Sequence, residues 1–565
     1  MDKKVKDAVY KYALQNAVRF EGKATPGAIT GKIIGEFPEL KERQKELMEV
    51  IKGIVNDVNS MDVEEQTAKL KEFAPELLEK KKVEKKGFPE LQGAEMGKVV
   101  TRIPPEPSKY NHIGHAMSFL INYLYAKKYN GKAVLRLEET NPLLAKQEYV
   151  DALMEDVVNF LDIKPDKIVY VSDDMPRFYE LAEKLISEGK AYVCFCQKEI
   201  MNDKRQNGAE CIHRNSPVDE NKKNWQRMLK GELKEGEAVL RLKIDMKSLN
   251  QVMRDPVMMR LVYAEHYRQK DKYKVWPMYD FENSVEEEFC GVTHILRSNE
   301  FGTMRGELQN FIRSLFGFKN PVVREYGRIN VVGAVTQGRE IRELIEQGKM
   351  NGWDDPRLVT IRALRRRGIV KEAFYELVNE VGLSKSQTNI DFTVIAAINR
   401  RLLDPVAKRF FFISDPVKIT VEKAPDMDVE LHINPNDKRG GRKLHTTTEF
   451  YIEKADFNVL EDGKLYRLMD CLNFVKHGDA FVFDSKEYEK FRSKGAKIIH
   501  WIPVSQSVSA SVLMPGDMQV GNMLITGVAE QNITQLHQGE IIQFERFGFC
   551  RLDSKEKMEF WFSHK

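Results

Sequence analysis

Two histidines, His112 and His115, stand three positions apart where a strand-like run of residues gives way to a helix-like one. Residues 98–103 are rich in β-branched types, and apolar residues of 117–124 recur at helical spacing. The first turn of a helix offers unpaired N–H groups and a positive dipole end, which attract phosphate. Gly114, between the histidines, lets a flat ring lie against the backbone. We therefore predict hydrogen bonding to phosphate oxygens, although ordinary capping or surface histidines would give the same short string.

The elements around this pair predict an α/β fold. The helix is expected to end at Asn130-Gly131, a good left-handed stop, before a buried strand over 132–137. A strand–helix–strand unit of this length predicts a parallel sheet with its ligand at the carboxyl ends of the strands. Three further strands are expected at 168–171, 238–244 and 294–297, and helices over most of 340–399.

A second group of chemically capable residues consists of two closely spaced pairs, Cys194 with Cys196 and Cys211 with His213. Three thiolates and one imidazole, supplied in pairs across a short polar loop, suit tetrahedral zinc. Such a site orders a small insertion that lacks a core of its own. The alternative is a set of unpaired buried cysteines, which are common in proteins.

Length and charge limit the class of protein. The 565 residues predict several domains, and 89 basic against 85 acidic residues mean that any nucleic-acid surface is local. The N-terminus lacks the apolar segment of a signal peptide, and no apolar run reaches the roughly 18 residues of a membrane helix. Together with only six cysteines, these features predict a cytoplasmic protein with no membrane partner.

Several segments resemble the glutamyl/glutaminyl branch of the class I aminoacyl-tRNA synthetases. His112-Ile-Gly-His115 resembles the HIGH signature of that class, within an Arg-x-Pro-Pro-Glu-Pro context typical of the branch. The N-terminal segments 11–17 and 22–24 are similar to the extra helical domain of archaeal glutamyl enzymes. The other matching segments are 136–142, 253–257, 276–281, 291–297 and 352–357.

The resemblance implies a multidomain fold with a Rossmann-like catalytic domain built on a parallel sheet. Antiparallel β-rich runs after about residue 404 predict C-terminal β-barrels. The expected divisions are an N-terminal helical domain (1–82), a linker (83–97), the first catalytic half (98–172), an insertion for the tRNA acceptor end with the zinc site (173–275), the second catalytic half (276–342), a helical region that contacts the tRNA stem (343–404) and anticodon-binding barrels (405–565).

The choice between glutamate and glutamine depends on a fixed cation, because a buried carboxylate without one would be costly. Arg297 ends a buried-looking strand and can bind a carboxylate through two hydrogen bonds. Glutamyl enzymes similarly have arginine here, whereas glutaminyl enzymes have a smaller uncharged residue. The resemblance adds Arg102 for a substrate carboxylate, Glu138 for the ammonium, and Tyr279 and Asn283 in the amino-acid pocket.

The resemblance also implies an ATP site on four residues: His112, Gly114, His115 and Glu300. Glu300 and Glu138 offer a plainer explanation of Arg297, namely a structural ion pair.

The loop that carries mobile lysines in the family departs from the pattern. Its serine position reads Gln337 and its lysine position reads Gly338, so that Arg339 is the nearest cation and joins His112 and His115 as a catalytic candidate. Either Arg339 and backbone amides stabilise the leaving pyrophosphate, or adenylation is slow, or activity is lost. Archaeal glutamyl enzymes similarly depart from the sequence pattern in this loop, which favours retained activity.

A cluster of arginines follows the segment 352–357 and suits contact with tRNA phosphates. A solvated helix face is an equally good explanation of such a cluster without the family context. Base reading is expected in the C-terminal barrels. The candidate contacts are Arg357, Arg362, Arg365 and Arg366.

The activity that the resemblance implies is ATP-dependent attachment of L-glutamate to tRNA(Glu) through a glutamyl-adenylate, with Mg²⁺ on the ATP phosphates. Zinc supports the glutamyl branch, since glutaminyl enzymes generally lack it. Whether tRNA(Gln) also receives glutamate stays open, and other translation factors are further candidate partners. The alternatives are a glutaminyl enzyme and a tRNA-binding paralogue without strong catalysis.

Overall fold

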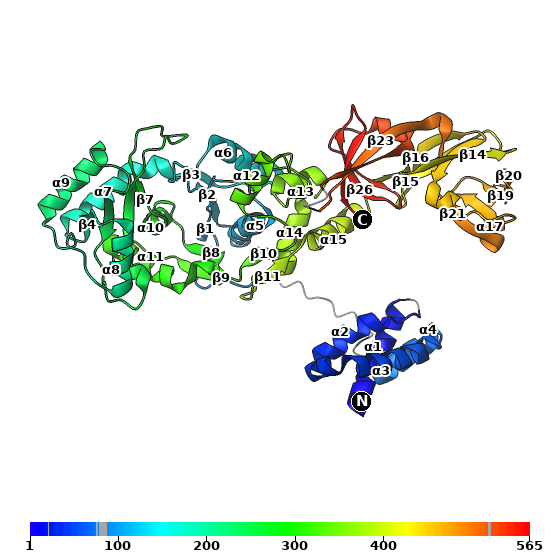
Figure 1. Cartoon of the computed structure of the whole chain (residues 1–565), viewed down its shortest axis with the longest axis horizontal. Coiled ribbons are helices and arrows are strands. Elements are labelled where there is room, and N and C mark those ends of the chain that lie inside the picture. The colour runs from blue at the N-terminus through cyan, green and yellow to red at the C-terminus, as the bar shows by residue number, and fades with distance from the viewer. Residues whose placement is uncertain (21, 75–76, 78–87, 518–520) are drawn as a thin grey trace. The chain divides into compact units, whose positions relative to one another are not determined.

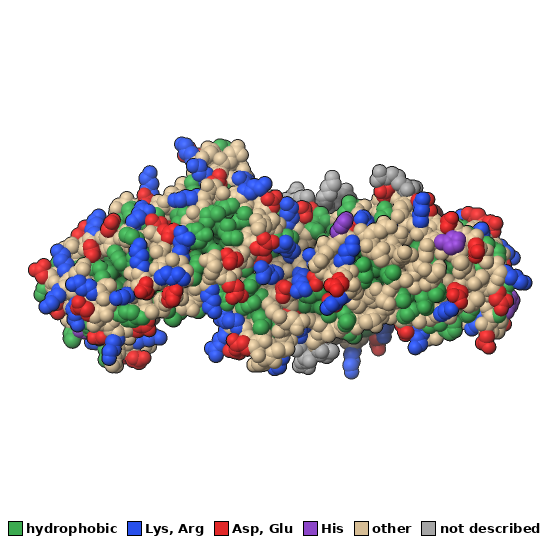
Figure 2. Space-filling view, turned by 90° about the horizontal axis from the view of Figure 1, so that it is seen from above, with side chains coloured by type: hydrophobic (Ala, Val, Ile, Leu, Met, Phe, Trp, Pro, Cys, Tyr) green, Lys and Arg blue, Asp and Glu red, His purple; other side chains and the backbone are tan. Residues whose placement is uncertain are grey.

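The computed structural model describes residues 1–20, 22–74, 77, 88–517 and 521–565, and the chain forms two compact units, Met1–Lys86 and Gly87–Lys565 (Figure 1). Residues 83–87 of the expected linker, and 75–76 and 78–82 before it, lie outside the described residues. On the face drawn in Figure 2, acidic and basic side chains are interspersed, as the nearly balanced charge predicts. Within the described part of the chain, no helix combines the length and the apolarity needed to cross a membrane.

The first unit is helical, as predicted. Asp62 caps its last full helix by accepting a hydrogen bond from the Glu65 N–H at 2.8 Å. Apolar residues such as Leu14, Ile51 and Val58 are fully buried between the helices and form its core. Its elements are α1 (Lys3–Arg19), α2 (Pro26–Glu36), η1 (Pro38–Arg43), α3 (Gln44–Asn59) and α4 (Val63–Phe73).

The second unit begins with the predicted parallel sheet, in which β1 (Val100–Ile103), β2 (Lys132–Leu137) and β3 (Lys167–Tyr170) lie in that order. Helix α5 (Ile113–Lys128) connects the first two strands, and the left-handed Asn130 (φ 49°) follows its end. The sheet then places the ends of its strands, and the loops that follow them, along one edge.

The segment between β3 and the second half of the sheet forms a four-stranded antiparallel sheet with helices. Its strands are β4 (Ala191–Cys194), β5 (Val239–Leu242), β6 (Val257–Leu261) and β7 (Val275–Pro277). The helices before and within it are α6 (Gln147–Leu153), the π-helix η3 (Met154–Phe160), η4 (Val171–Asp174), α7 (Met175–Ser187), α8 (Lys198–Asn207), α9 (Val218–Lys230) and η5 (Gln251–Met253).

The chain then returns beside β1 through β8 (His294–Ser298), which pairs in parallel with β9 (Val322–Tyr326) in a separate two-stranded sheet. The Val100 N–H donates to Thr293 Oγ1 at 2.8 Å, which connects β1 to the start of β8. The elements around it are α10 (Tyr279–Phe289), η6 (Asn299–Phe301), α11 (Gly302–Phe316), β9 (Val322–Tyr326) and β10 (Ile329–Val331). The helical region that follows has α12 (Gly338–Glu346), α13 (Ile361–Arg367), α14 (Lys371–Val381), β11 (Thr388–Ile390) and α15 (Phe392–Leu403).

Two seven-stranded sheets make up most of the C-terminal part, with orders β12-β25-β26-β27-β23-β24-β13 and β21-β18-β19-β20-β14-β17-β22. Most pairs are antiparallel, as expected, but β12–β25, β14–β20, β18–β21 and β23–β27 are parallel. The hairpin β15–β16 and short helices complete this part. The bounds are β12 (Lys408–Phe410), β13 (Phe412–Ile413), β14 (Pro416–Glu422), β15 (Met427–Asn434), β16 (Asp437–Thr446), β17 (Glu449–Glu453), α16 (Lys454–Phe457), β18 (Leu465–Leu468), β19 (Asn473–His477), β20 (Ala480–Ser485), α17 (Tyr488–Lys494), β21 (Gly495–Ile499), β22 (Trp501–Pro503), η7 (Val504–Gln506), β23 (Ser507–Met514), β24 (Met523–Glu530), η8 (Gln531–Gln535), β25 (Ile541–Phe544), β26 (Gly548–Ser554) and β27 (Glu559–His564).

Candidate active site

The two histidines cap the first turn of α5, because the Nδ1 atom of each accepts a backbone hydrogen bond. The Gly114 N–H donates to His112 Nδ1 at 3.1 Å, and the His112 N–H donates to His115 Nδ1 at 3.2 Å. The ring centroids lie 3.8 Å apart. A Cβ added at Gly114 would lie 3.0 Å from His112 Cε1, so that the glycine leaves room for the ring. The histidines therefore cap the helix and also keep one face of the site in place.

This capping determines which nitrogen of each imidazole ring carries the proton. Burial lowers the pKa of His112 to about 4 and holds the pKa of His115 well below its usual value, so both rings are neutral near pH 7. Because each Nδ1 accepts a backbone hydrogen bond, the ring proton belongs on Nε2. Both side chains thus keep an Nε2–H donor, which is the group that a phosphate oxygen gaining charge requires.

A cavity of about 1000 Å³ opens at the carboxyl ends of β1, β2 and β8, where the fold predicts a ligand. The loop between β1 and α5, helix α10 and residues 329–337 supply the rest of its wall. Asn283 and Arg339 are not in that wall. The predicted residues that do line the cavity are Arg102, His112, Gly114, His115, Glu138, Tyr279, Arg297 and Glu300.

A buried network of charges connects the floor of the cavity. Glu287 Oε1 accepts from Arg102 Nε at 3.0 Å and from Arg136 Nη2 at 3.3 Å, with all three side chains at most 3% exposed. The same Arg136 Nη2 lies 2.8 Å from Glu138 Oε1, which also accepts from Asn283 Nδ2 at 3.1 Å. Burial alone would raise the pKa of Glu287, but the two guanidinium groups lower it overall. Asn283 therefore acts on the cavity by holding Glu138.

Arg297 lies at the end of β8 with its side chain only 5% exposed. Its Nη1 donates to Gln309 Oε1 at 2.9 Å, and its Nη2 lies 3.5 Å from Glu325 Oε1 on the adjacent strand β9. Glu300, one of the two ion-pair partners suggested above, instead contacts Arg328 at 2.9 Å. Arg297 is thus a positioned cation in the cavity wall, and its carboxylate partner is Glu325.

Two acids in the cavity wall, Glu106 and Glu282, escaped sequence reasoning. Glu282 follows Tyr279 by one helical turn, and its side chain accepts a hydrogen bond from Thr140 Oγ1. Its other oxygen has no hydrogen-bond partner among the described residues. Burial, reinforced by the charge of Glu138, raises its pKa well above the usual value. The available signal was the spacing of acids on α10, which places Glu282 on the same face as Tyr279 and Glu286.

Comparison with known proteins decides the family. The family model described as the catalytic domain of class I tRNA synthetases (E and Q) matches residues 98–405, and two models of the anticodon-binding domains match 407–489 and 498–553. The chain belongs to the class I glutamyl and glutaminyl tRNA synthetases. The range matched by the catalytic-domain model includes every residue of the cavity described above.

Curated relatives of this synthetase match it along nearly its whole length. The glutamate–tRNA ligase of Pyrococcus abyssi is 42% identical over 98% of this chain and 99% of its own. That of Thermococcus kodakarensis is 39% identical over 99% and 100%. A solved glutamate tRNA ligase from Elizabethkingia meningosepticum, in complex with its amino acid, is 18% identical with a TM-score of 0.42, and covers 55% of this chain and 70% of its own.

The loop that departs from the synthetase pattern lines the cavity, but Arg339 is not part of that lining. Thr336 and Gln337 line the cavity, whereas the Arg339 side chain on α12 is 88% exposed and donates from Nε to Glu343 at 2.9 Å. Arg339 therefore does not line the cavity, and its catalytic role stays a prediction. Lys109 and Arg328, which sequence reasoning did not select, are cations in the cavity wall.

The four arginines proposed to contact tRNA already have partners inside this synthetase. Arg357 is 6% exposed and lies 2.8 Å from its buried partner Asp355, while Arg365 pairs with Glu155. Arg366 contacts acids of two other segments, at 2.8 and 2.7 Å, the second of them in β26. Arg362 lies 5.0 Å from the Tyr110 ring centroid. Their contact with tRNA stays a prediction, and their present contacts connect α13 with its surroundings.

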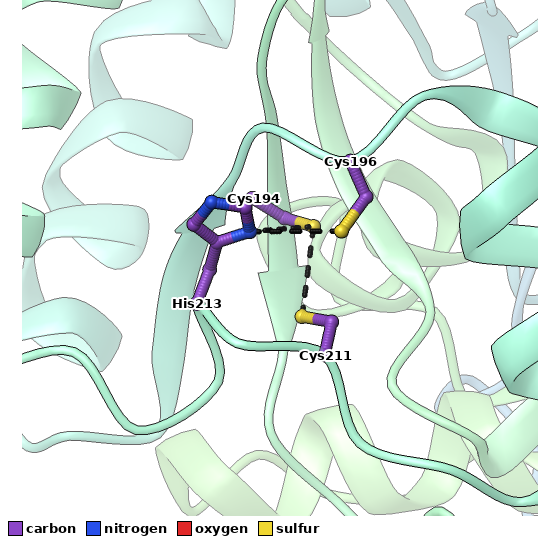
Figure 3. Close-up of side chains that lie close together, drawn as sticks. All are labelled: Cys194, Cys196, Cys211 and His213. Carbon is purple, nitrogen blue, oxygen red and sulfur yellow. Dashed lines mark hydrogen bonds between the residues drawn. The ribbon is translucent and has the colours of Figure 1, made fainter.

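The cysteine and histidine pairs converge at the end of β4, as Figure 3 shows. Cys194 Sγ lies 3.8 Å from Cys211 Sγ, and His213 Nδ1 lies 3.9 and 3.6 Å from the Sγ atoms of Cys194 and Cys196. Ligands about 2.3 Å from a tetrahedral zinc ion would be about 3.8 Å apart. The buried Arg241 places Nη1 3.8 Å from two of these sulfurs, which balances thiolate charge. The donor set and its spacing therefore fit zinc.

The neutral state of the histidines predicts a flat pH dependence. Because the pKa of His112 is about 4 and that of His115 is also lowered, kcat/KM for ATP in pyrophosphate exchange should show no histidine titration from about pH 6 to 8. The measurement is the pH profile of wild type beside His112→Asn, whose amide can still cap the helix. A limb with a pKa of about 6.5 that disappears in the variant would contradict the assignment.

The charge network predicts an unequal effect of two neighbouring substitutions on α10. Glu287→Gln leaves Arg102 and Arg136 without a carboxylate, and the loss of one buried partner costs about 3–5 kcal/mol. Glu288→Gln, at the exposed next position, should leave stability unchanged. Thermal unfolding of both variants measures the difference. Equal midpoints would show that Glu287 does not support the cavity.

Proposed function

We propose that this synthetase joins L-glutamate to tRNA(Glu) in two steps at the expense of ATP. An oxygen of the glutamate α-carboxylate forms a bond to the α-phosphorus, and the bond from that phosphorus to the oxygen bridging to the β-phosphate breaks. Pyrophosphate leaves with that electron pair, and glutamyl-adenylate remains. A terminal ribose hydroxyl of tRNA then takes the acyl group, and AMP leaves. Glutamate–tRNA ligases that match nearly the whole chain support this activity.

The observation that carries the choice of amino acid is the buried Arg297 in the cavity wall. Its guanidinium is held by Gln309 and Glu325, so it meets the side-chain carboxylate of glutamate without reorganisation. A glutamine amide is neutral and would not give the charge-assisted hydrogen bonds that a carboxylate gives at this desolvated position. Arg102, held by Glu287, provides the second contact to a substrate carboxylate in this proposal.

The ammonium group of glutamate is assigned to Glu138. Arg136 and Asn283 both donate to Glu138 Oε1, so that Oε2 is the oxygen assigned to the ligand. The Glu138 side chain is 12% exposed. Tyr279 contributes its hydroxyl to the same pocket, and burial raises its pKa, so that it stays a neutral hydrogen-bond donor. This assignment accounts for each predicted substrate residue except Asn283, which acts through Glu138.

The nucleotide is assigned to the first turn of α5. The Nε2–H groups of His112 and His115 and the N-terminus of the helix face the phosphates, and Gly114 allows close approach. Glu300, held by Arg328 and by the Ser298 cap, belongs to the ATP side of the cavity. Magnesium on the ATP phosphates is part of the proposal, and catalysis rests on positioning and charge stabilisation without a covalent protein nucleophile.

Zinc held by Cys194, Cys196, Cys211 and His213 is proposed as a structural ion. It would supply cross-links between the end of β4 and the turn after α8, a segment with little apolar core. Arg241 compensates for the thiolates, as a group outside the ligand sphere commonly does.

The role of Arg297 predicts a loss of amino-acid selectivity. Arg297→Gln should lower kcat/KM for glutamate by about 100-fold or more, as truncation of a desolvated charge pair does. The kcat/KM for glutamine should change little, so that the ratio of kcat/KM for glutamate to that for glutamine falls sharply. The assay is tRNA-dependent pyrophosphate exchange with each amino acid. Arg324→Gln, on β9 but outside the cavity wall, is the matched control, and an equal loss in both variants would refute the assignment.

The zinc proposal is tested without an activity assay. Freshly purified protein should hold about one zinc per chain, and Cys211→Ser should lose it because a tetrahedral site then lacks a thiolate. Cys290→Ser, which changes a cysteine outside the cluster, should keep the metal. Metal analysis of the three proteins gives the result, and wild type with a content near zero would remove the proposal.

A further inference from the structure

Lys109 and Gly338 face each other at the edge of the cavity. Lys109 belongs to the loop between β1 and α5, and Gly338 is the first residue of α12. A Cβ added at Gly338 would lie 3.1 Å from Lys109 Cδ and 3.2 Å from Lys109 Cβ. Gly338 is not among the glycines with positive φ, so its backbone would accept a side chain. The stem of Lys109 is what fills the space that a residue at 338 would need.

The surroundings of Lys109 place its ammonium on the nucleotide side of the cavity. Lys109 is partly buried and lines the cavity with His112, His115 and Gln337. Its charge contributes to the low pKa of both histidines, which means that the ammonium lies near their rings. The ion pairs formed among the described residues do not include Lys109, whereas Arg328 pairs with Glu300. Burial lowers the pKa of Lys109, while the charge of Glu106 in the same wall favours its protonated form. A cation that forms no direct ion pair in a cavity is suited to bind an anionic ligand.

We propose that Lys109 supplies the cation that stabilises the departing pyrophosphate, in place of the lysine that the loop lacks at Gly338. The inference rests on the proposed function, since it concerns the first of the two steps described above. Lys109 stays protonated and donates hydrogen bonds to the β- and γ-phosphate oxygens as the bond between the α-phosphorus and the bridging oxygen breaks. It transfers no proton and forms no covalent bond. Arg339, exposed and paired with Glu343, has no part in this assignment.

The geometry makes an exchange of the two residues possible. Lys109→Met keeps the length of the stem and removes the charge, so it separates the ammonium from the packing. In the double variant Lys109→Gly with Gly338→Lys, the stem is gone and a lysine extends from the other wall of the same cavity. Alanine at 109 would not serve, because its Cβ would still lie 3.2 Å from the new Cβ at 338.

The experiment measures glutamate-dependent pyrophosphate exchange in the presence of tRNA. Lys109→Met should lower kcat by about 10²–10³-fold, as the loss of one donor to a developing charge does, with KM for glutamate unchanged. The kcat of the double variant should be at least about tenfold higher than that of Lys109→Met, and the kcat of Lys109→Arg should lie between those of Lys109→Met and wild type. Lys146→Met, at an exposed position before α6, is the matched control and should keep wild-type kcat.

A second readout separates catalysis from folding. Transfer of glutamate from supplied glutamyl-adenylate to tRNA releases no pyrophosphate, so Lys109→Met should perform it within about twofold of wild type. Unchanged exchange in Lys109→Met, no recovery in either rescue variant, or an equal loss in the transfer step would each overturn the inference. Wild type without any glutamate-dependent exchange would instead refute the proposed function.

Discussion

The carboxylate of Glu287 is the interaction on which the arrangement of the cavity depends. It is fully buried and bonds Arg102 of β1 and Arg136 of β2, while its own helix, α10, belongs to the other half of the catalytic region. Two guanidinium groups side by side in an apolar interior repel each other, and each alone would be costly to bury. One acid between them offsets both costs and fixes the distance between the halves. Because Arg136 also contacts Glu138, the same acid indirectly positions a group that faces the ligand.

This chain of contacts keeps the charged groups of the cavity in fixed positions, which the proposed selectivity for glutamate requires. Arg102 and Arg297 in the wall are held by Glu287 of α10 and Glu325 of β9, and such regular elements are stiffer than loops. Arg297, for example, is paired with Glu325 through the parallel register of β8 and β9. A ligand with two carboxylates and one ammonium therefore meets charges already in position and loses less free energy to reorganisation. Burial, reinforced by the charge of Glu138, raises the pKa of Glu282 and so favours its neutral form in the same wall.

The sequence could predict what local pattern determines and little of what distant segments decide. The strand 132–137, the stop at Asn130 and the zinc-type cluster follow from spacing and turn chemistry, and the structure has each where it was expected. The contacts of Arg366 could not be foreseen, because Asp553 lies 187 positions away. The role of Glu287 could not be predicted either, because an acid on an amphipathic helix is by default expected to face solvent. Arg339 was selected for its position in a motif, although side-chain direction on α12 exposes it.

A motif records a position along the chain, whereas phosphate chemistry requires a charge at a position in space. The loop before α5 and the loop before α12 both line the cavity, so that in the proposal a cation on either loop would meet the same phosphate oxygens. A side chain at 338 would crowd the stem of Lys109, because its Cβ would lie 3.1–3.2 Å from two Lys109 carbons. Steric exclusion therefore couples the two positions, and a glycine in the loop does not by itself indicate lost activity. The absence of a motif residue becomes informative only after the volume it would occupy has been inspected.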